Sequence, residues 1–271
     1  MNDLDGEKVR TAVREHYGKV AELKEPGCAP GCCGAGAQSS LRLGYSEEDL
    51  AALPAGADLG LGCGNPQAIA NLRPGDTVVD LGSGAGFDCF WAARKVGPSG
   101  KVIGVDMTAS MVTKARENAS RANVQGVEFR LGEIEHLPVA DASADVILSN
   151  CVINLVHDKR AAFGEAFRVL KSGGRLAISD VVTTAPLPAA LQEQLAALTG
   201  CVSGASPADD LRAILFEVGF EAVKIDVKPE SREFIRDWIP GSGSENYIAA
   251  ATIEAVKAKS ESCCGPDCCA S

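Results

Sequence analysis

The sequence lacks any long apolar run. No stretch approaches the roughly 18–20 apolar residues that a membrane span requires, and residues 1–10 lack the apolar segment of a secretory signal peptide. Positive charge is also scarce, because 26 Lys and Arg face 36 Asp and Glu for a net charge of -10. An acidic chain gains no electrostatic attraction to nucleic acid or anionic lipid. We therefore expect a cytoplasmic protein with no nucleic-acid or membrane partner.

Cysteine, in contrast, is abundant, with 11 residues in the chain. In a small exported protein this number would indicate a disulfide framework, but a chain of 271 residues with 46% hydrophobic residues can bury a core of its own. Thiols in a reducing compartment are better explained by a soft ligand or by redox chemistry. The cysteines form an N-terminal group, a C-terminal group and four singletons: Cys28, Cys32, Cys33; Cys263, Cys264, Cys268, Cys269; and Cys63, Cys89, Cys151, Cys201.

Strand and helix patterns alternate from residue 77 onward. Short runs rich in Val, Ile and Leu predict strands, and segments with apolar residues at helical spacing predict helices between them. The predicted strands are 77–81, 101–106, 127–130, 144–150 and 174–180, and the helices are 87–96, 109–122 and 158–170. This alternation is typical of an α/β fold, a Rossmann-like, doubly wound and mostly parallel sheet with helices on both faces.

The flanking regions suggest four parts of the chain. Residues 1–75 comprise a helix over 3–24 and an irregular Cys- and Gly-rich cap with a short helix near Ser46–Ala52, and residues 76–182 form the core. Residues 183–256 are expected to bind the acceptor and complete the sheet. Their predicted elements are helices 187–198 and 208–218 and strands 222–227 and 247–253. Residues 257–271 are a polar, Cys-rich tail.

A glycine-rich turn follows the first predicted strand. The segment from Asp80 to Gly86 reads DLGSGAG, and such glycines let the backbone approach a ligand at a helix N-terminus. NAD-binding proteins use the same device, so the turn alone does not name the ligand. The second strand ends in Asp106, an acid placed to bind a ribose diol.

DLGSGAGFD and the following GVDMT resemble the first two motifs of class I methyltransferases. The resemblance implies S-adenosylmethionine as methyl donor. It also implies that the segment GEIEHLP after the third strand contacts adenine and that Asn150 faces the transferable methyl group. The cofactor-binding residues implied in this way are Asp80, Gly82, Gly84, Gly86, Asp106, Met107, Ile134, Glu135 and Asn150.

Cys151 directly follows the fourth predicted strand, at the edge where open parallel sheets bind ligands. Taken alone it could be a nucleophile, a ligand for the acceptor or core filling. The segment SNCVINL at 149–155 closely resembles the arsenite methyltransferase family, as do the contexts of Cys63 in GCG and of Cys201 in GCVSG. The resemblance implies that Cys63, Cys151 and Cys201 meet in space.

The resemblance implies an enzyme that methylates arsenite and methylarsenite and thereby detoxifies arsenic. Trivalent arsenic is soft and binds thiolates, and three thiolates would leave its lone pair free to face the methyl group. Transfer then requires in-line alignment rather than a catalytic histidine. Zinc is the competing ligand, but structural zinc usually takes four ligands with paired cysteine spacing, and these three are isolated in the sequence.

The resemblance also implies a disulfide between an N-terminal cysteine and Cys63 during turnover, with Cys32 the first choice for that cysteine. A thiol reductant would then be required, with thioredoxin or glutathione as partner. The C-terminal cysteines resemble the tails of family members and are not expected to be catalytic. Leu61 stands where relatives often carry an aromatic residue over the cofactor.

Two other functions remain open at this point. A methyltransferase of a small organic acceptor would not need three separated cysteines. A thiol-rich arsenic-sequestering protein would bind arsenite without consuming S-adenosylmethionine. We expect a monomer in each case.

Overall fold

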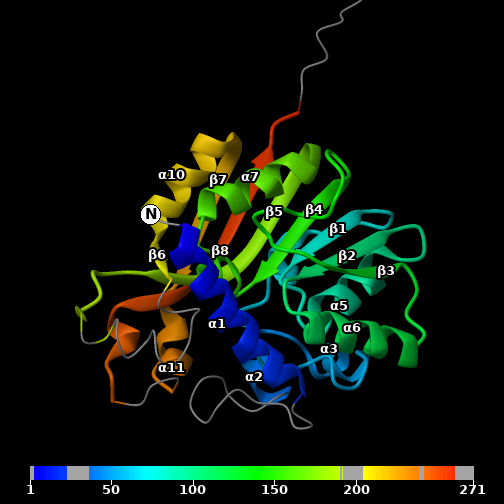
Figure 1. The fold of residues 1–271 in the computed structure, drawn as a ribbon, viewed down its shortest axis with the longest axis horizontal. Coiled ribbons are helices and arrows are strands. Elements are labelled where there is room, and N and C mark those ends of the chain that lie inside the picture. The colour runs from blue at the N-terminus through cyan, green and yellow to red at the C-terminus, as the bar shows by residue number, and fades with distance from the viewer. Residues whose placement is uncertain (1–2, 23–36, 190, 192–203, 238–240, 260–271) are drawn as a thin grey trace, which may run out of the picture.

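The computed structural model describes residues 3–22, 37–189, 191, 204–237 and 241–259. A single sheet runs through this part of the chain, with helices on both faces (Figure 1). Its strand order is β3-β2-β1-β4-β5-β8-β7, and the short β6 pairs with β5. The strands are β1 (Thr77–Leu81), β2 (Lys101–Asp106), β3 (Val127–Leu131), β4 (Ala144–Asn150), β5 (Leu170–Thr183), β6 (Ser206–Pro207), β7 (Phe220–Lys228) and β8 (Ile248–Lys257).

The described helices mostly follow the sequence expectations. Ser46 caps the short helix near residue 50, and its reciprocal bonds with Asp49 form a capping box. The helix predicted over 187–198 falls mainly on residues outside the described part. The helices are α1 (Asp3–Glu22), α2 (Ala37–Arg42), α3 (Glu47–Ala51), α4 (Gln67–Ala70), α5 (Phe87–Val96), α6 (Ala109–Arg121), α7 (Lys159–Val169), α10 (Ala208–Val218) and α11 (Arg232–Ile235), with 3-10 turns η1 (Ile153–Leu155), η2 (Pro229–Ser231) and η3 (Ser244–Asn246).

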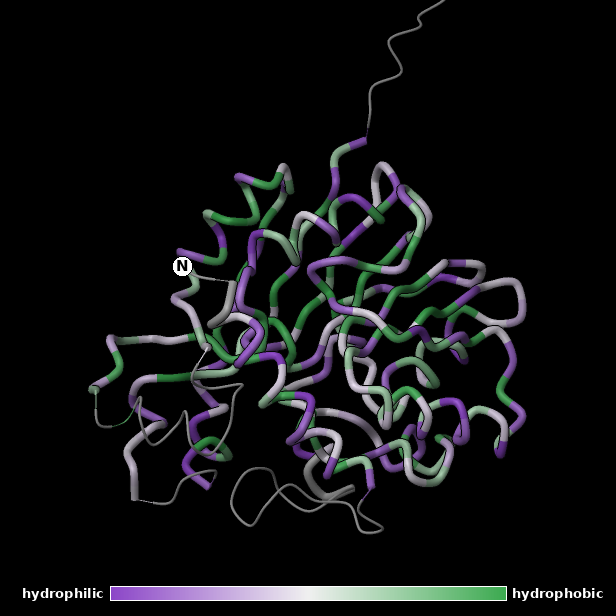
Figure 2. The backbone as a smooth tube through the Cα atoms, viewed as in Figure 1, coloured by the Kyte–Doolittle hydropathy of each residue, from purple (hydrophilic) through white to green (hydrophobic). Residues whose placement is uncertain are grey.

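The inner parallel strands β1, β2 and β4 are mostly apolar because both of their faces are covered. Ile147 and Leu148 follow each other in β4 and point to opposite faces, so they belong to two separate cores. One core contains Phe163 of α7 and Leu215 of α10. The other contains Phe90 of α5. Figure 2 shows the hydrophobic residues concentrated along the central strands. Among the described helices, none combines the length and hydrophobicity needed to cross a bilayer.

The C-terminal strands complete the sheet. The strand predicted over 247–253 is confirmed and extends to Lys257 as β8, which lies antiparallel between β5 and β7. Ile253 thereby pairs with Ile178 of β5 on one side and with Ile225 of β7 on the other. The predicted fold class, a mostly parallel sheet of the class I methyltransferase type, is confirmed.

The N-terminal region adds helical structure at the carboxyl end of the sheet. α1 contacts α6 and the turn η1, which directly follows β4. The sequence predicted irregular structure over 25–75 apart from one short helix, whereas the described residues of that range also form α2 and α4. Residues 23–36, which include Cys28, Cys32 and Cys33 of the predicted cap, lie outside the described part.

Candidate active site

The glycine turn after β1 adopts backbone conformations that favour glycine. Gly84 has φ +50° and Gly86 has φ +96°. A Cβ on Gly86 would lie 2.6 Å from the ring of Phe90, whereas a Cβ on Gly84 would have no neighbour within 4 Å. Gly86 is therefore needed for packing at the start of α5, and Gly84 leaves open space for a ligand.

Asp106 ends β2 beside this turn. Its two carboxylate oxygens accept hydrogen bonds from the backbone N–H of Gly84 at 2.9 Å and of Thr108 at 2.8 Å. Burial raises the pKa of Asp106, and these backbone bonds partly offset that effect. The carboxylate is thus held in one orientation by the backbone of two loops.

A cavity enclosing about 1150 Å³, part of it open to solvent, lies at this carboxyl edge of the sheet. Leu61 lines it and packs on an apolar cluster that contains Leu59 and Met111, so leucine does cover an apolar face there. Gly86 is absent from its lining. The predicted cofactor-binding residues that line it are Asp80, Gly82, Gly84, Asp106, Met107, Ile134, Glu135 and Asn150.

Helix α1 supplies one wall of the cavity, which the sequence analysis missed. Arg10 and Tyr17 line it. The Arg10 guanidinium lies 3.8 Å from the carboxylates of both Glu133 and Glu135, and Arg14 lies 3.3 Å from Glu133. These ion pairs connect α1 to the segment after β3. The signal in the sequence was the pair of arginines one helical turn apart opposite GEIE.

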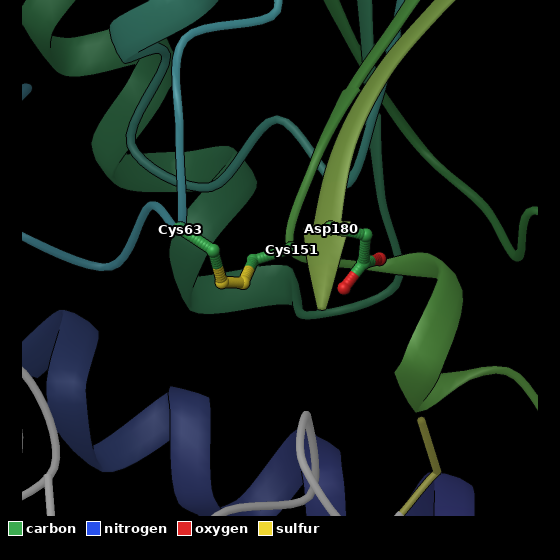
Figure 3. Close-up of side chains that lie close together, drawn as sticks. All are labelled: Cys63, Cys151 and Asp180. Atoms are coloured by element: carbon green, nitrogen blue, oxygen red, sulfur yellow. A yellow bond between two sulfur atoms is a disulfide. The ribbon is translucent and has the colours of Figure 1, made fainter. Parts of the chain in front are cut away.

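Cys63 and Cys151 meet at the same edge, joined as a disulfide with Cα atoms 5.5 Å apart although 88 residues separate them in sequence (Figure 3). Both are buried, and Cys151 also lines the cavity. The resemblance implied a disulfide of Cys63 with an N-terminal cysteine instead. The pair found here puts two sulfurs beside the cavity.

Asn150 holds this arrangement together. Its side-chain oxygen accepts the backbone N–H of Cys63 at 3.1 Å, and its Nδ2 donates to the carbonyl of Gly64 at 2.9 Å. Cys151 itself has φ +60°, a left-handed conformation uncommon for a residue other than glycine. Its N–H donates to the Ser179 carbonyl of β5 at 2.8 Å. The chain thus turns sharply where β4 ends.

Asp180 of β5 lies beside the two sulfurs, and the sequence analysis assigned it no role. One ligand atom from each of Cys63, Cys151 and Asp180 lies within 4.8 Å of the others (Figure 3). Burial raises the pKa of Asp180 to about 7. An acid at the end of the strand next to Asn150-Cys151 was the available signal, since adjacent parallel strands end at one edge.

The comparisons with known proteins agree with this geometry. Residues 72–232 match the family model of a methyltransferase domain. The arsenite methyltransferase of Halobacterium salinarum is 54% identical over 266 residues, which cover 94% of this chain and 68% of that protein. The chain belongs to the arsenite methyltransferase family. The resemblance seen in SNCVINL is thereby confirmed.

Other arsenite methyltransferases match a smaller part of this chain. The one from Aquipseudomonas alcaligenes is 38% identical over 77% of this chain and 61% of its own length. The solved arsenic(III) S-adenosylmethionine methyltransferase from Chlamydomonas reinhardtii superposes with a TM-score of 0.59 at 30% identity, covering 82% of this chain and 73% of that one. This chain therefore spans about three fifths to three quarters of these arsenite methyltransferases.

A second buried acid supports the site of this arsenite methyltransferase family member. The Asp88 carboxylate accepts hydrogen bonds from the Tyr45 hydroxyl at 2.7 Å and from the side-chain amides of Gln67 and Asn150, both at 3.1 Å. Burial raises the pKa of Asp88, and the three bonds oppose that effect. Through Asn150 this cluster positions the backbone of Cys63. Sequence reasoning missed it because its members lie far apart in the chain.

Two cysteines that the arsenite methyltransferase resemblance implies, Cys32 and Cys201, lie outside the described residues. A third thiolate from Cys201 and a relay through Cys32 stay predictions. So does the role of Cys63 and Cys151 as arsenic ligands, since the structure shows their proximity and not a bound metalloid.

Proposed function

We propose that this chain transfers methyl groups from S-adenosylmethionine to thiolate-bound trivalent arsenic, giving methylated arsenicals. The observation that carries the proposal is the position of Cys151, which lines the cavity beside the glycine turn and is paired with Cys63. One residue thus belongs both to the cofactor cavity and to the sulfur pair, as transfer from one to the other requires.

The cavity fits S-adenosylmethionine in its chemistry. The open space at Gly84 admits a ligand against the backbone, Asp106 presents a fixed carboxylate to a ribose diol, and Met107 and Ile134 offer apolar surface to adenine. Carboxylates that line the cavity, such as Asp80 and Asp88, would attract the positively charged sulfonium. The cofactor would supply an electrophilic methyl group, which the arsenic lone pair would take by in-line displacement as S-adenosylhomocysteine leaves. The product arsenic would be formally pentavalent, and two thiols would return it to the trivalent state by forming a disulfide.

The sulfur atoms are proposed to hold the substrate. Cys63 and Cys151, with Cys201 as third ligand, would bind arsenic as thiolates, because a soft metalloid prefers sulfur to oxygen or nitrogen. Methylarsenite has one coordination position occupied by carbon and needs only two thiolates. We propose arsenite and methylarsenite as the two substrates on this ground.

A thiol reductant is proposed as a further requirement. The disulfide between Cys63 and Cys151 cannot bind arsenic until it is reduced. One external dithiol, or two molecules of a monothiol, would exchange with it, forming an external disulfide and leaving two protein thiols. We propose thioredoxin or glutathione as the physiological source, with Cys32 in the relay. A reaction that consumes thiols requires a reducing compartment, so we propose that the enzyme acts in the cytoplasm. We also propose that it is a monomer and that it detoxifies arsenic.

Incubation of the full chain with S-adenosylmethionine, a dithiol and arsenite, followed by arsenic speciation, tests the proposal. Methylated arsenic with matching loss of S-adenosylmethionine is the expected result. Stoichiometric arsenite binding without cofactor consumption would favour sequestration instead. Turnover of a small organic acceptor by a chain lacking Cys63, Cys151 and Cys201 would favour the other methyltransferase class.

A further inference from the structure

Asp180 is an unusual neighbour for two sulfurs. It is 1% exposed and lies in β5 directly after Ser179, where the pairing with β4 ends. One of its oxygens lies within 4.8 Å of the sulfurs of Cys63 and Cys151. Figure 3 shows its carboxyl group beside the sulfur pair at the end of the strand. A buried carboxylate in this position has lost its water and needs polar partners.

The two well-formed hydrogen bonds to Asp180 both reach the same oxygen, while the backbone N–H groups of Ile153 and Asn154 also lower its pKa. Oδ1 accepts the side-chain amide of Asn154 at 2.8 Å and the backbone N–H of Val181 at 2.7 Å. Oδ2 has no hydrogen-bond partner among the described residues. The half-buried Lys159 ammonium, whose charge lowers the pKa of Asp180, donates to the Gly204 carbonyl at 2.9 Å. The carboxylate is therefore anchored through one oxygen while the other remains available.

Arsenous acid can supply the hydrogen-bond donor that this carboxylate oxygen lacks. When As(OH)3 reacts with the two thiols of Cys63 and Cys151, two arsenic–sulfur bonds form, two arsenic–oxygen bonds break and two water molecules leave. Arsenic stays trivalent, so no electrons are transferred. One hydroxyl remains on arsenic and can donate a hydrogen bond. Oδ2 of Asp180 is an acceptor without a donor among the described residues.

We propose that Asp180 binds this remaining hydroxyl and so favours arsenite over methylarsenite at the Cys63–Cys151 pair. The inference rests on the proposed function, from which it takes the substrate. Methylarsenite bound by the same two sulfurs turns a methyl group instead of a hydroxyl toward the carboxylate. The free oxygen then stays buried without a partner, which disfavours that complex.

The test compares both substrates in the reduced full chain and in Asp180→Asn. The amide retains Oδ1 for Asn154 and Val181 but replaces the charged acceptor by an N–H group. Removing a charged hydrogen-bond acceptor should lower kcat/KM for arsenite about 10-fold and change kcat/KM for methylarsenite less than about twofold. Asp145→Asn is the matched control, since Asp145 accepts bonds from Thr77 and Lys171 near the opposite end of β4. Asp145→Asn should leave kcat/KM unchanged for both arsenite and methylarsenite.

Equal losses on both substrates would overturn the proposal, because they would indicate a structural role for Asp180. No loss, or a loss confined to methylarsenite, would overturn it as well. If the amide variant fails to bind S-adenosylmethionine by calorimetry, Asp180→Ser takes its place under the same criteria.

A binding measurement separates this inference from the proposed function. Arsenite and methylarsenite affinities of the reduced protein, without cofactor, are measured by titration with each arsenical alone. A selective loss of arsenite affinity in Asp180→Asn supports the inference even if the unchanged chain transfers no methyl group. Unchanged relative affinities overturn it even if the unchanged chain is an active methyltransferase.

Discussion

Two carboxylates lie near the carboxyl ends of two parallel strands of the same sheet and are held in different ways. Asp106 of β2 accepts a backbone N–H on each oxygen, from turns that directly follow β1 and β2. Asp180 of β5 has one oxygen anchored and one without a partner in the described part of the chain. The cofactor side of the cavity is thus built by local backbone geometry. The acceptor side depends on side chains that come together from distant segments.

The largest expected effect tests the acceptor side. Cys151→Ser should lower methylation of both arsenite and methylarsenite to below about 1% of the unchanged chain, because the substrate loses its anchor beside the methyl donor. Cys63→Ser should do the same for arsenite but spare methylarsenite, which needs only two thiolates and can then bind through Cys151 and the proposed third ligand Cys201. Arsenic speciation measures both. Cys89 is a buried cysteine outside the pair, and its thiol donates to Asp80. The Cys89→Ser variant should retain activity, because the serine hydroxyl can still donate to Asp80. Full activity of Cys151→Ser would contradict the assigned site.

The second effect tests the backbone geometry of the cofactor side. Gly86→Ala should lower the free energy of unfolding by about 2–4 kcal/mol, because the new Cβ combines left-handed strain with overlap on Phe90. Gly243→Ala is the matched control, since Gly243 is also left-handed, with φ +73° and ψ +15°, but its Cβ would meet only the Asn246 side chain, at 3.5 Å. It should cost only about 1–2 kcal/mol of backbone strain. Denaturant unfolding measures both, and equal costs would remove the packing argument.

The third effect compares the two carboxylates directly. Asp106→Ala should raise the Kd for S-adenosylmethionine about 10- to 100-fold, since a charged acceptor for the ribose is lost. Asp180→Asn should leave that Kd within about twofold, since Asp180 serves the acceptor. Isothermal titration calorimetry gives both values. An unchanged Kd in Asp106→Ala would refute the ribose role.

The smallest effect concerns pH and stability. The pKa of Asp180 is raised to about 7 in the folded protein, so the folded state binds this proton more tightly than the unfolded state. Folding stability associated with Asp180 is therefore present below its unfolded pKa and declines as pH rises toward 7. The stability of Asp180→Asn relative to the unchanged chain should rise by about 2 kcal/mol between pH 5 and pH 7. A constant difference across that interval would show that Asp180 titrates normally.

Local patterns allowed much of the cofactor side to be predicted from the sequence. The strand over 77–81, the glycine turn and the helix over 87–96 agree with the structure because each depends on neighbouring residues. The position of β8 between β5 and β7 could not be predicted, since it depends on pairing between segments far apart. The same holds for Asp88, whose partners Tyr45, Gln67 and Asn150 come from three separate segments.

The acceptor side was predicted through resemblance more than through pattern. Isolated cysteines carry no spacing signal, and Cys89 shows that a buried free cysteine also occurs outside the pair. The proximity of Cys63 and Cys151 was implied by their family contexts, and the structure brings them together. Asp180 was read only as the end of a strand, because nothing in its own segment indicates that one oxygen lacks a partner.

The left-handed backbone of Cys151 sets stability and activity against each other at one position. Glycine or asparagine suits that conformation better than cysteine does, but neither supplies sulfur. A library randomised at position 151 and selected for thermal resistance alone should therefore enrich residues that cannot anchor arsenic, whereas selection for survival on arsenite should recover cysteine.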